Sequence, residues 1–313
     1  MRYKHVKNAG IDISALAVGT WAIGGQFYGE VNDKDSIEAI RAMIDGGVNL
    51  VDTAPCYGNG YSEQVVGKAL ADGYREKVFL ATKFGISTDS KFIKNGSYEN
   101  CIRECDESLR RLNTDHIDIY IMHWPDPETP VEEAMRALVD LKKSGKIRFV
   151  GVSNFDIPLL ERAQKVVQID MVQPPYSMIK EEAKDILLWC EKNGVGTMTY
   201  GSLGSGLLTG TIRQKPNYAA DDMRNTFYGD LYSEPKFSKI QTLLKTLDGI
   251  CEAHNKPMPQ VAINWSTQKS YVSTAICGVR NAEEAKQNCS TFDWQLTDEE
   301  MKLIDDKLEE LKI

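Results

Sequence analysis

Asn49-Leu-Val-Asp-Thr-Ala-Pro-Cys-Tyr-Gly58 is the stretch that decides the fold, because a short apolar run ends there in an aspartate and a tyrosine follows five residues later. The run indicates a buried strand, since it is short, apolar and bounded by Gly46-Gly47 and Pro55. An aspartate at the end of such a strand is costly unless it is paired or faces a cavity. The next two apolar runs repeat the arrangement, with Val78–Lys83 ending in a lysine and Ile117–His123 ending in a histidine.

Eight strand-like runs alternate with helical patterns whose apolar residues lie three and four apart. Continuous rather than alternating apolar strands, each followed by a helix, predict a (β/α)8 TIM barrel. A doubly wound sheet is the alternative, but no Gly-x-Gly-x-x-Gly turn follows the first strand. The expected strands are 17–19, 49–52, 78–83, 117–123, 147–153, 171–173, 196–200 and 272–277.

Three features of the sequence lie outside the regular alternation of strands and helices. Tyr3–Val6 and 11–13 indicate an N-terminal β-hairpin that turns at Gly10, and Thr297-Asp-Glu-Glu300 is a capping box that predicts a C-terminal amphipathic helix. The connection from Gly201 to Phe237 is long and therefore favours a functional role. We expect residues 1–313 to form a single barrel domain.

Composition excludes several classes of partner. A formal net charge of -8 argues against nucleic acid and against an anionic membrane surface. No apolar run has the length of a signal core or a membrane span, so we expect a cytoplasmic protein. The seven cysteines lack Cys-x-x-Cys spacing, which indicates reduced thiols, and we expect no metal even at Cys101 and Cys105, four positions apart.

In a barrel, the C-terminal strand ends form one face, which would bring together Asp52, Tyr57, Lys83 and His123. An ammonium about 4 Å from a tyrosine, at an effective dielectric near 20, favours phenolate by roughly 4 kcal/mol before desolvation offsets it. Lys83 would thus make Tyr57 a general acid and base, while Asp52 holds Lys83 charged and His123 donates a hydrogen bond to a substrate oxygen. The alternative is an ordinary buried salt bridge beside two pocket residues.

Several further motifs accompany these four residues, namely Gly19-Thr20-Trp21, Asp52-Thr-Ala-x-x-Tyr57-Gly58, Lys83, His123-Trp124, Gly145-Lys-Ile-Arg-Phe-Val-Gly-Val-Ser-Asn154, Gln173 and Gly206-Leu-Leu-Thr-Gly210. In these motifs and their spacing, the chain resembles the aldo-keto reductase family over nearly its whole length. The resemblance implies an NAD(P)H-dependent oxidoreductase that reduces an aldehyde or ketone, such as one derived from a sugar or polyol, to an alcohol. It makes Tyr57 the proton donor, with Asp52, Lys83 and His123 completing a catalytic tetrad.

The same resemblance implies a cofactor site. Ser153, Asn154 and Gln173 would bind the nicotinamide carboxamide, Tyr200 would stack on its ring, and the loop after Tyr200 would cover the pyrophosphate. Many relatives have Tyr-Ser-Pro-Leu where this chain has Tyr200-Gly-Ser-Leu, which leaves the conformation of that loop open. The expected cofactor residues are Gly19, Thr20, Trp21, Asp52, Ser153, Asn154, Gln173, Tyr200, Gly201, Ser202, Leu203, Ser205, Gly206, Gly278, Arg280, Glu284, Gln287 and Asn288.

Two residues bear on the choice of cofactor. Arg280 could pair bidentately with a 2′-phosphate, whereas the Glu284 carboxylate would repel it. NADP(H) is favoured and NAD(H) stays possible.

The substrate is expected to be a small-molecule carbonyl compound held among aromatic side chains, which could alternatively serve only to pack the loops. Three rival functions remain. A metal-dependent hydrolase would need a cluster of His, Asp and Glu ligands at strand ends, but there are only four histidines, and three of them lie away from the predicted C-terminal strand ends, namely His5, His116 and His254. A Schiff-base lyase would use Lys83 as nucleophile. A redox-sensing regulatory subunit with slow turnover would resemble barrel proteins that bind nicotinamide cofactor and modulate ion channels. The expected substrate residues are Trp21, Tyr28, Tyr57, Phe84, His123 and Trp124, with Tyr228 as a further candidate.

Overall fold

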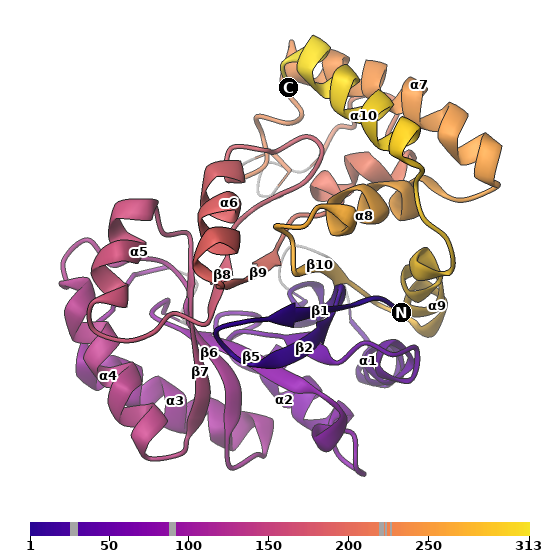
Figure 1. Cartoon of the computed structure of the whole chain (residues 1–313). Coiled ribbons are helices and arrows are strands. Elements are labelled where there is room, and N and C mark those ends of the chain that lie inside the picture. Colours follow the sequence, from indigo (N-terminus) through magenta and orange to yellow (C-terminus); the bar gives the residue numbers. More distant parts are fainter. Residues whose placement is uncertain (26–30, 88–91, 219–221, 223, 226) are drawn as a thin grey trace.

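The strands around Asp52 close into a barrel (Figure 1). The computed structural model of the protein describes residues 1–25, 31–87, 92–218, 222, 224–225 and 227–313. Eight strands pair in parallel in the order β10-β3-β4-β5-β6-β7-β8-β9, which confirms the predicted (β/α)8 barrel. The barrel strands are β3 (Leu16–Gly19), β4 (Leu50–Asp52), β5 (Phe79–Phe84), β6 (Ile117–Met122), β7 (Ile147–Ser153), β8 (Met171–Gln173), β9 (Gly196–Thr199) and β10 (Thr274–Gly278).

Helices begin and end at the residues that cap them. Asn32 accepts from the backbone N–H groups of Lys34 and Asp35 at the start of α1, and Gly194 ends α6 in the left-handed region with φ of 72°. The α-helices are α1 (Asp33–Asp45), α2 (Tyr61–Ala69), α3 (Tyr98–Leu112), α4 (Val131–Lys143), α5 (Ile157–Gln164), α6 (Lys184–Asn193), α7 (Lys236–His254), α8 (Met258–Gln268), α9 (Ala282–Cys289) and α10 (Asp298–Leu311).

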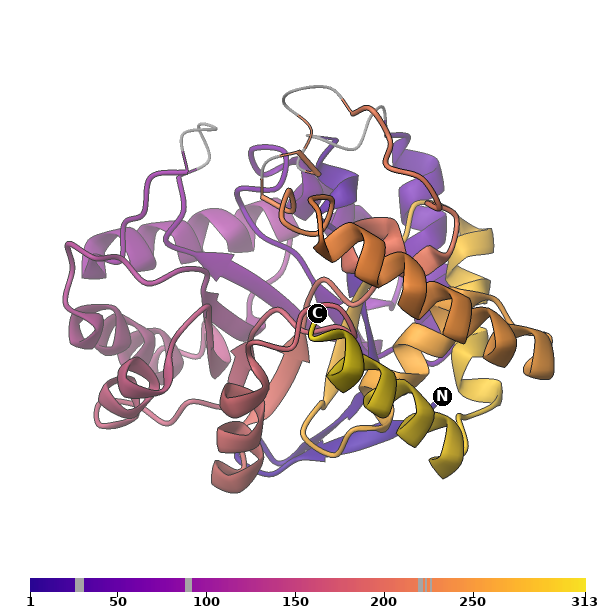
Figure 2. The same ribbon diagram turned by 90° about the horizontal axis from the view of Figure 1, so that it is seen from above.

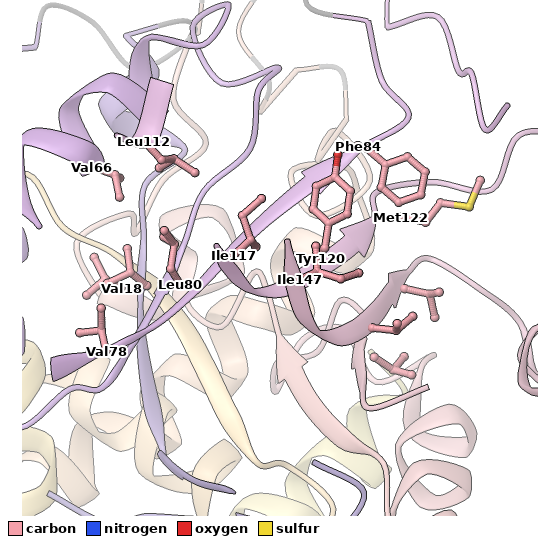
Figure 3. Packing of buried hydrophobic residues seen from close by; sticks show 14 of the residues in the cluster. Val18, Val66, Val78, Leu80, Phe84, Leu112, Ile117, Tyr120, Met122 and Ile147 are labelled. Atoms are coloured by element: carbon pink, nitrogen blue, oxygen red, sulfur yellow. The ribbon is translucent and has the colours of Figure 1, made fainter. Parts of the chain in front are cut away.

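The largest part of the core lies between the barrel and its helices. Side chains on the outer face of the strands, such as Val18, Leu80 and Tyr120, pack against apolar helix residues such as Val66 and Leu112 (Figure 3). At about 25 cal/mol per Å² of buried apolar surface, this layer is the main favourable contribution to folding. The strand residues between them face the barrel interior.

The N-terminal hairpin closes one mouth of the barrel. Strands β1 (Tyr3–Val6) and β2 (Ile11–Ser14) pair antiparallel as predicted, and the turn places Gly10 at φ of 65°. Val6 and Ile13 pack onto the inward-facing residues of the strands, and the Asn8 N–H donates to the carbonyl of Gly194, just before β9. The hairpin therefore covers the N-terminal strand ends and leaves the opposite mouth for chemistry.

Within its described residues, the connection between β9 and β10 carries the α-helices α7 and α8. Helix α8 packs against β10 in the ring of helices, whereas α7 lies farther out beside α10 (Figures 1 and 2). The capping box predicted at Thr297 and Glu300 begins α10, which confirms that helix. In the described part of the chain, we find no helix with the length and apolar character needed to span a membrane.

Candidate active site

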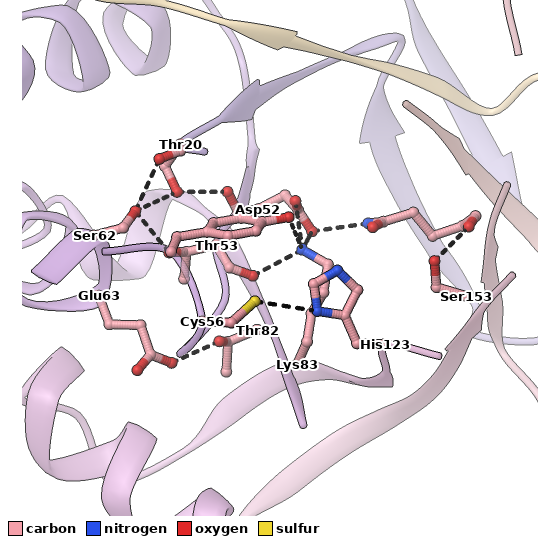
Figure 4. A network of polar contacts seen from close by, with 12 residues as sticks. Thr20, Asp52, Thr53, Cys56, Ser62, Glu63, Thr82, Lys83, His123 and Ser153 are labelled. Carbon is pink, nitrogen blue, oxygen red and sulfur yellow. Dashed lines mark hydrogen bonds and ion pairs between the residues drawn. The ribbon is translucent and has the colours of Figure 1, made fainter. Parts of the chain in front are cut away.

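Asp52 and Lys83 form a buried ion pair at the C-terminal ends of β4 and β5. The Lys83 ammonium is fully buried and donates to both Asp52 carboxylate oxygens, at 2.9 and 2.7 Å, and to the Thr53 carbonyl at 2.8 Å (Figure 4). Taking an ammonium out of water costs several kcal/mol, which only good geometry offsets. Three acceptors arranged around one nitrogen provide that geometry.

Tyr57 lies above this pair, in the loop that follows β4. Its hydroxyl is 3.3 Å from the Lys83 ammonium, which donates to it. Gly58 fixes the loop, because it has φ of 63° and a Cβ there would lie 2.3 Å from the Gly24 carbonyl oxygen. The predicted convergence of Asp52, Tyr57 and Lys83 on one face is therefore present.

The electrostatics of Tyr57 differ from the sequence-based expectation. Loss of water around the phenol raises the pKa of Tyr57 well above its ordinary value, and the Asp52 carboxylate raises it further. The lowering that we expected from Lys83 is outweighed, because burial is the largest cause of the shift and the Asp52 carboxylate lies 2.7 Å from the ammonium. Tyr57 therefore stays protonated at neutral pH, which is the form that a proton donor needs.

His123 follows β6 directly and faces Tyr57. The two rings meet edge to face, with centroids 5.9 Å apart. Burial, together with the Lys83 charge, lowers the pKa of His123 well below its ordinary value, so the imidazole is neutral. Its Nδ1 atom lies 3.6 Å from the Cys56 sulfur. A neutral imidazole keeps one N–H available to donate to a ligand.

Polar side chains at the ends of β7 and β8 join this group. Gln173 donates from Nε2 to Asp52 Oδ1 at 2.8 Å, and the Ser153 hydroxyl donates to the Gln173 carbonyl at 2.7 Å. Asn154, in the left-handed region at φ of 61°, donates to the His123 carbonyl at 3.0 Å. Tyr200 donates to Asn154 Oδ1 at 2.8 Å. The structure thus brings these four predicted residues together beside the tetrad.

A hydroxyl cluster supports the Asp52 backbone from below. Thr20 donates to the Asp52 carbonyl at 2.9 Å, as its place in the expected site suggests. Ser62, on α2, lies 2.8 Å from the Thr20 hydroxyl and 3.1 Å from that of Thr53 (Figure 4). Sequence reasoning missed Ser62 and Thr53, and serine and threonine are too common at helix starts and turns to signal such a role. Gly19 pairs with Asp52 across β3 and β4.

The loop after Tyr200 takes an unusual backbone course. Gly201, Ser205 and Gly206 all have positive φ, of 73°, 53° and 96°. Ser202 is buried and donates to the Ile276 carbonyl at 3.2 Å, which ties the loop to β10, while Leu203 packs partly buried between two core clusters. Gly204 has a positive φ as well, so Ser205 is the one residue other than glycine among these four positions, and Tyr232 holds it by donating to its carbonyl at 2.8 Å.

The expected adenosine segment lies at the end of β10 and the start of α9. Glu284 accepts from Arg280 twice, from the backbone N–H at 2.9 Å and from Nη2 at 2.8 Å, and 68% of the Arg280 side chain is exposed. Asn288 is buried and donates to the Gly278 carbonyl at 3.3 Å. Gln287 is exposed on the next turn. The two residues that we expected to act in opposite ways on a 2′-phosphate therefore form an ion pair with each other.

Some, but not all, of the aromatic side chains expected near Tyr57 lie there. Trp21 stacks near Tyr57, with centroids 6.1 Å apart, and Tyr228 lies 6.5 Å from Trp21. Trp124 contacts the small apolar cluster beside Tyr57. These three residues border the mouth around Tyr57.

Of the other two expected substrate residues, Phe84 lies elsewhere. Phe84 is fully buried and stacks on Tyr120 in the outer core, 5.0 Å between centroids, because the residue after the inward-facing Lys83 points to the opposite side of β5 (Figure 3). Phe84 therefore packs in the core and does not line the substrate site, contrary to our expectation. Tyr28 lies outside the described residues.

Comparisons with known proteins identify relatives for this arrangement. The model of the Aldo/keto reductase family matches residues 15–309. The chain is 36% identical to the aldo-keto reductase YhdN of Bacillus subtilis, covering 99% of this chain and 94% of that protein. It is 32% identical to an NADH-specific methylglyoxal reductase of Escherichia coli, covering 96% and 97%.

The comparison of structures agrees. A solved glycerol dehydrogenase, AKR11B4 from Gluconobacter oxydans, superposes with a TM-score of 0.89 at 34% identity, covering 98% of this chain and 95% of that chain. Fold, barrel topology and relatives thus point the same way, and the chain belongs to the aldo/keto reductase family of oxidoreductases.

Proposed function

We propose that the protein reduces an aldehyde or a ketone to an alcohol with NAD(P)H, and that Tyr57 donates the proton. The observation that carries the proposal is the contact of the Tyr57 hydroxyl with a buried, carboxylate-bound ammonium. A protonated phenol held at a fixed position suits general acid catalysis, which typically contributes 10²–10⁴-fold to rate. Nicotinamide, when bound, supplies the hydride for the carbonyl carbon.

Each tetrad residue has a distinct part in the proposal. Tyr57 protonates the carbonyl oxygen as negative charge develops on it, and Lys83 stabilises the phenolate that remains. Asp52 keeps Lys83 charged and oriented through two hydrogen bonds. His123, neutral because of burial, donates a hydrogen bond to the same oxygen and so orients the carbonyl group.

The polar groups beside the tetrad fit a nicotinamide dinucleotide. The Gln173 side chain is 3% exposed, and within the described residues its Oε1 atom accepts no hydrogen bond, which leaves an acceptor for a carboxamide NH2 group. A Cβ at Gly201 would meet nothing within 4 Å, so the start of the loop borders open space. Ser153, Asn154 and Tyr200 complete the proposed nicotinamide end, and the 201–206 loop the pyrophosphate end.

NADP(H) is the favoured cofactor in this proposal, and NAD(H) is the alternative. The Arg280–Glu284 pair is exposed, and such pairs contribute only about 0–1 kcal/mol. A 2′-phosphate, which guanidinium binds bidentately, can therefore replace Glu284. The E. coli relative named above is NADH-specific by its name, which is the reason that NAD(H) stays in the proposal.

A short carbonyl compound derived from a polyol or sugar is the proposed substrate. Relatives at 32% and 34% identity bear the names methylglyoxal reductase and glycerol dehydrogenase, both of which point to small oxygen-rich substrates. Trp21, which stacks near Tyr57, and Trp124, which packs against the same small cluster as Tyr57, would contact such a molecule.

A titration tests this function. Purified protein is titrated with NADPH and, separately, with NADH while the fluorescence of its five tryptophans is followed, because Trp21 lies beside the proposed site. We then add 9,10-phenanthrenequinone as a permissive carbonyl, followed by methylglyoxal, glyceraldehyde and dihydroxyacetone. Tight binding and oxidation of the cofactor are expected. Binding of neither nucleotide would contradict the proposal.

A further inference from the structure

Cys56 makes a contact that the proposed function does not use. It precedes Tyr57 and lies 8% exposed in a small apolar cluster with Ala54 and Ile86. Figure 4 shows its sulfur joined to the His123 ring, with Sγ 3.6 Å from Nδ1. A side chain that only filled space would not require its sulfur to contact the imidazole nitrogen.

The chemistry of the two groups fixes the direction of the hydrogen bond. A neutral imidazole has one N–H donor and one bare nitrogen, and sulfur is a weak acceptor. Burial raises the pKa of Cys56 to about 12, so the thiol keeps its hydrogen at neutral pH. The bare nitrogen is the better acceptor, and the thiol is the group with a hydrogen to give. These properties favour an S–H group that donates to Nδ1, with the ring proton on Nε2.

Nε2 is the atom left for the reaction. Within the described residues, no hydrogen bond to it is found, whereas the His123 main chain is held by Asn154. Asn154 fixes the main chain at His123, and a hydrogen bond from Cys56 to Nδ1 then restrains rotation of the ring. Its remaining N–H is then the donor left for a carbonyl oxygen beside Tyr57, whose ring centroid lies 5.9 Å from that of His123.

We infer that Cys56 is a positioning residue: its thiol donates to Nδ1 of His123, which fixes the ring in the Nε2–H tautomer and in the orientation that contacts the substrate oxygen. The inference rests on the proposed function for the identity of that oxygen. The contact itself is independent of turnover, so it can be measured in protein without substrate. Cys56 has no chemical step of its own.

Nitrogen NMR tests the inference on full-length protein labelled with ¹⁵N-histidine. The four histidines, His5, His116, His123 and His254, give few signals, and a His123→Gln variant assigns the relevant one. We expect a pyrrole-type Nε2 and a pyridine-type Nδ1 in the wild type and in Cys56→Ser, which keeps a donor. Cys56→Ala should show averaged values from mixed tautomers.

Kinetics provide the second readout. Loss of one modest hydrogen bond predicts that kcat for reduction falls about 3- to 10-fold in Cys56→Ala. Cys56→Ser should restore most of it, and the dissociation constant of the cofactor should not change in either variant.

A pyridine-type Nε2 in the wild type would overturn the inference. So would a pure Nε2–H tautomer with unchanged kcat in Cys56→Ala. If no carbonyl is reduced at all, the proposed function fails, and the tautomer spectra alone then decide whether Cys56 holds His123.

Discussion

Charge balance around a single nitrogen defines the site at the scale of residues. Lys83 is fully buried, and its ammonium is shared by Asp52, Thr53 and Tyr57. Burial and the Asp52 carboxylate keep Tyr57 protonated, while burial and the Lys83 charge keep His123 neutral. The arrangement therefore presents two hydrogen-bond donors to a ligand oxygen rather than a phenolate and an imidazolium.

The pH dependence of reduction follows from these two shifts. Since the pKa of His123 is lowered, its neutral form persists as pH falls through about 6.5, and since that of Tyr57 is raised, its protonated form persists as pH rises to about 9. We expect kcat/KM at saturating cofactor to be flat over about pH 6–9. A decline centred at the ordinary histidine pKa would contradict the assignment for His123.

Removal of the Glu284 charge should change cofactor affinity. Glu284→Gln frees Arg280 from an ion pair of about 0–1 kcal/mol, so NADPH should bind up to about 5-fold more tightly, with little change for NADH. Glu283→Gln is the matched control, because it removes the same charge one residue away and Glu283 accepts from Gln287 instead. Equal effects of both variants in fluorescence titrations would show that Arg280 is not involved.

The sequence allowed the tetrad to be predicted because each residue lies at or just beyond the end of an apolar strand. The burial of Phe84 was not foreseen, although alternation along β5 opposes it to Lys83. Ser62 could not be found, because its contacts with Thr20 and Thr53 depend on how the first turn of α2 packs beneath β4. That packing is a property of the folded chain and has no local motif.

At the scale of elements, a buried ion pair links α2, α3 and β5. Glu63 is fully buried and accepts from Thr82 on β5 at 2.6 Å and from Arg111 on α3 at 2.5 Å. Thr82 is the neighbour of Lys83, so this pair also holds the strand that carries the ammonium. Two helices are thereby fixed against the strand.

Loss of Arg111 should therefore destabilise the fold. Arg111→Met leaves a buried carboxylate without its partner, which is expected to cost about 3–5 kcal/mol in the free energy of unfolding. The control Arg110→Met, at an exposed position of the same helix, should change it by less than about 0.5 kcal/mol.

Urea denaturation measures both variants. Adding Glu63→Gln to Arg111→Met should recover part of the loss, because the uncompensated charge disappears. If the double variant were less stable than Arg111→Met by the full cost of a lost hydrogen bond, the charge would not be the cause.

The region between β9 and β10 shows the limit of prediction for elements. Its two helices, α7 and α8, have apolar patterns of similar strength in the sequence, so spacing alone does not tell which belongs to the ring around the barrel. Contacts decide it, since α8 packs on β10 and α7 on α10. Strand positions were predictable because each short apolar run needs burial on both faces.

The whole molecule is a barrel closed at one mouth and reactive at the other. The hairpin fills the N-terminal mouth through Val6 and Ile13, far from the strand ends that carry Asp52 and Lys83. Stability and chemistry are thus separated along the barrel axis, as is general for this fold.

Substitution in the hairpin should affect stability and spare catalysis. Ile13 is fully buried, so Ile13→Ala is expected to cost about 2–5 kcal/mol in the free energy of unfolding, with kcat unchanged where both proteins are folded. The control Ile11→Ala lies on the same strand at a half-buried position and should cost less. Thermal unfolding and steady-state rates measured together check this. A loss of kcat without loss of stability would contradict the separation.

The most direct test of the account is single-turnover oxidation of bound NADPH by 9,10-phenanthrenequinone in Tyr57→Phe, followed by stopped flow beside a fluorescence titration of the cofactor. If Tyr57 donates the proton, the rate falls about 10²–10⁴-fold, while the dissociation constant of NADPH stays nearly unchanged, because the lost interaction matters mainly in the transition state. A Tyr57→Phe protein that turns over at the wild-type rate would contradict the central claim.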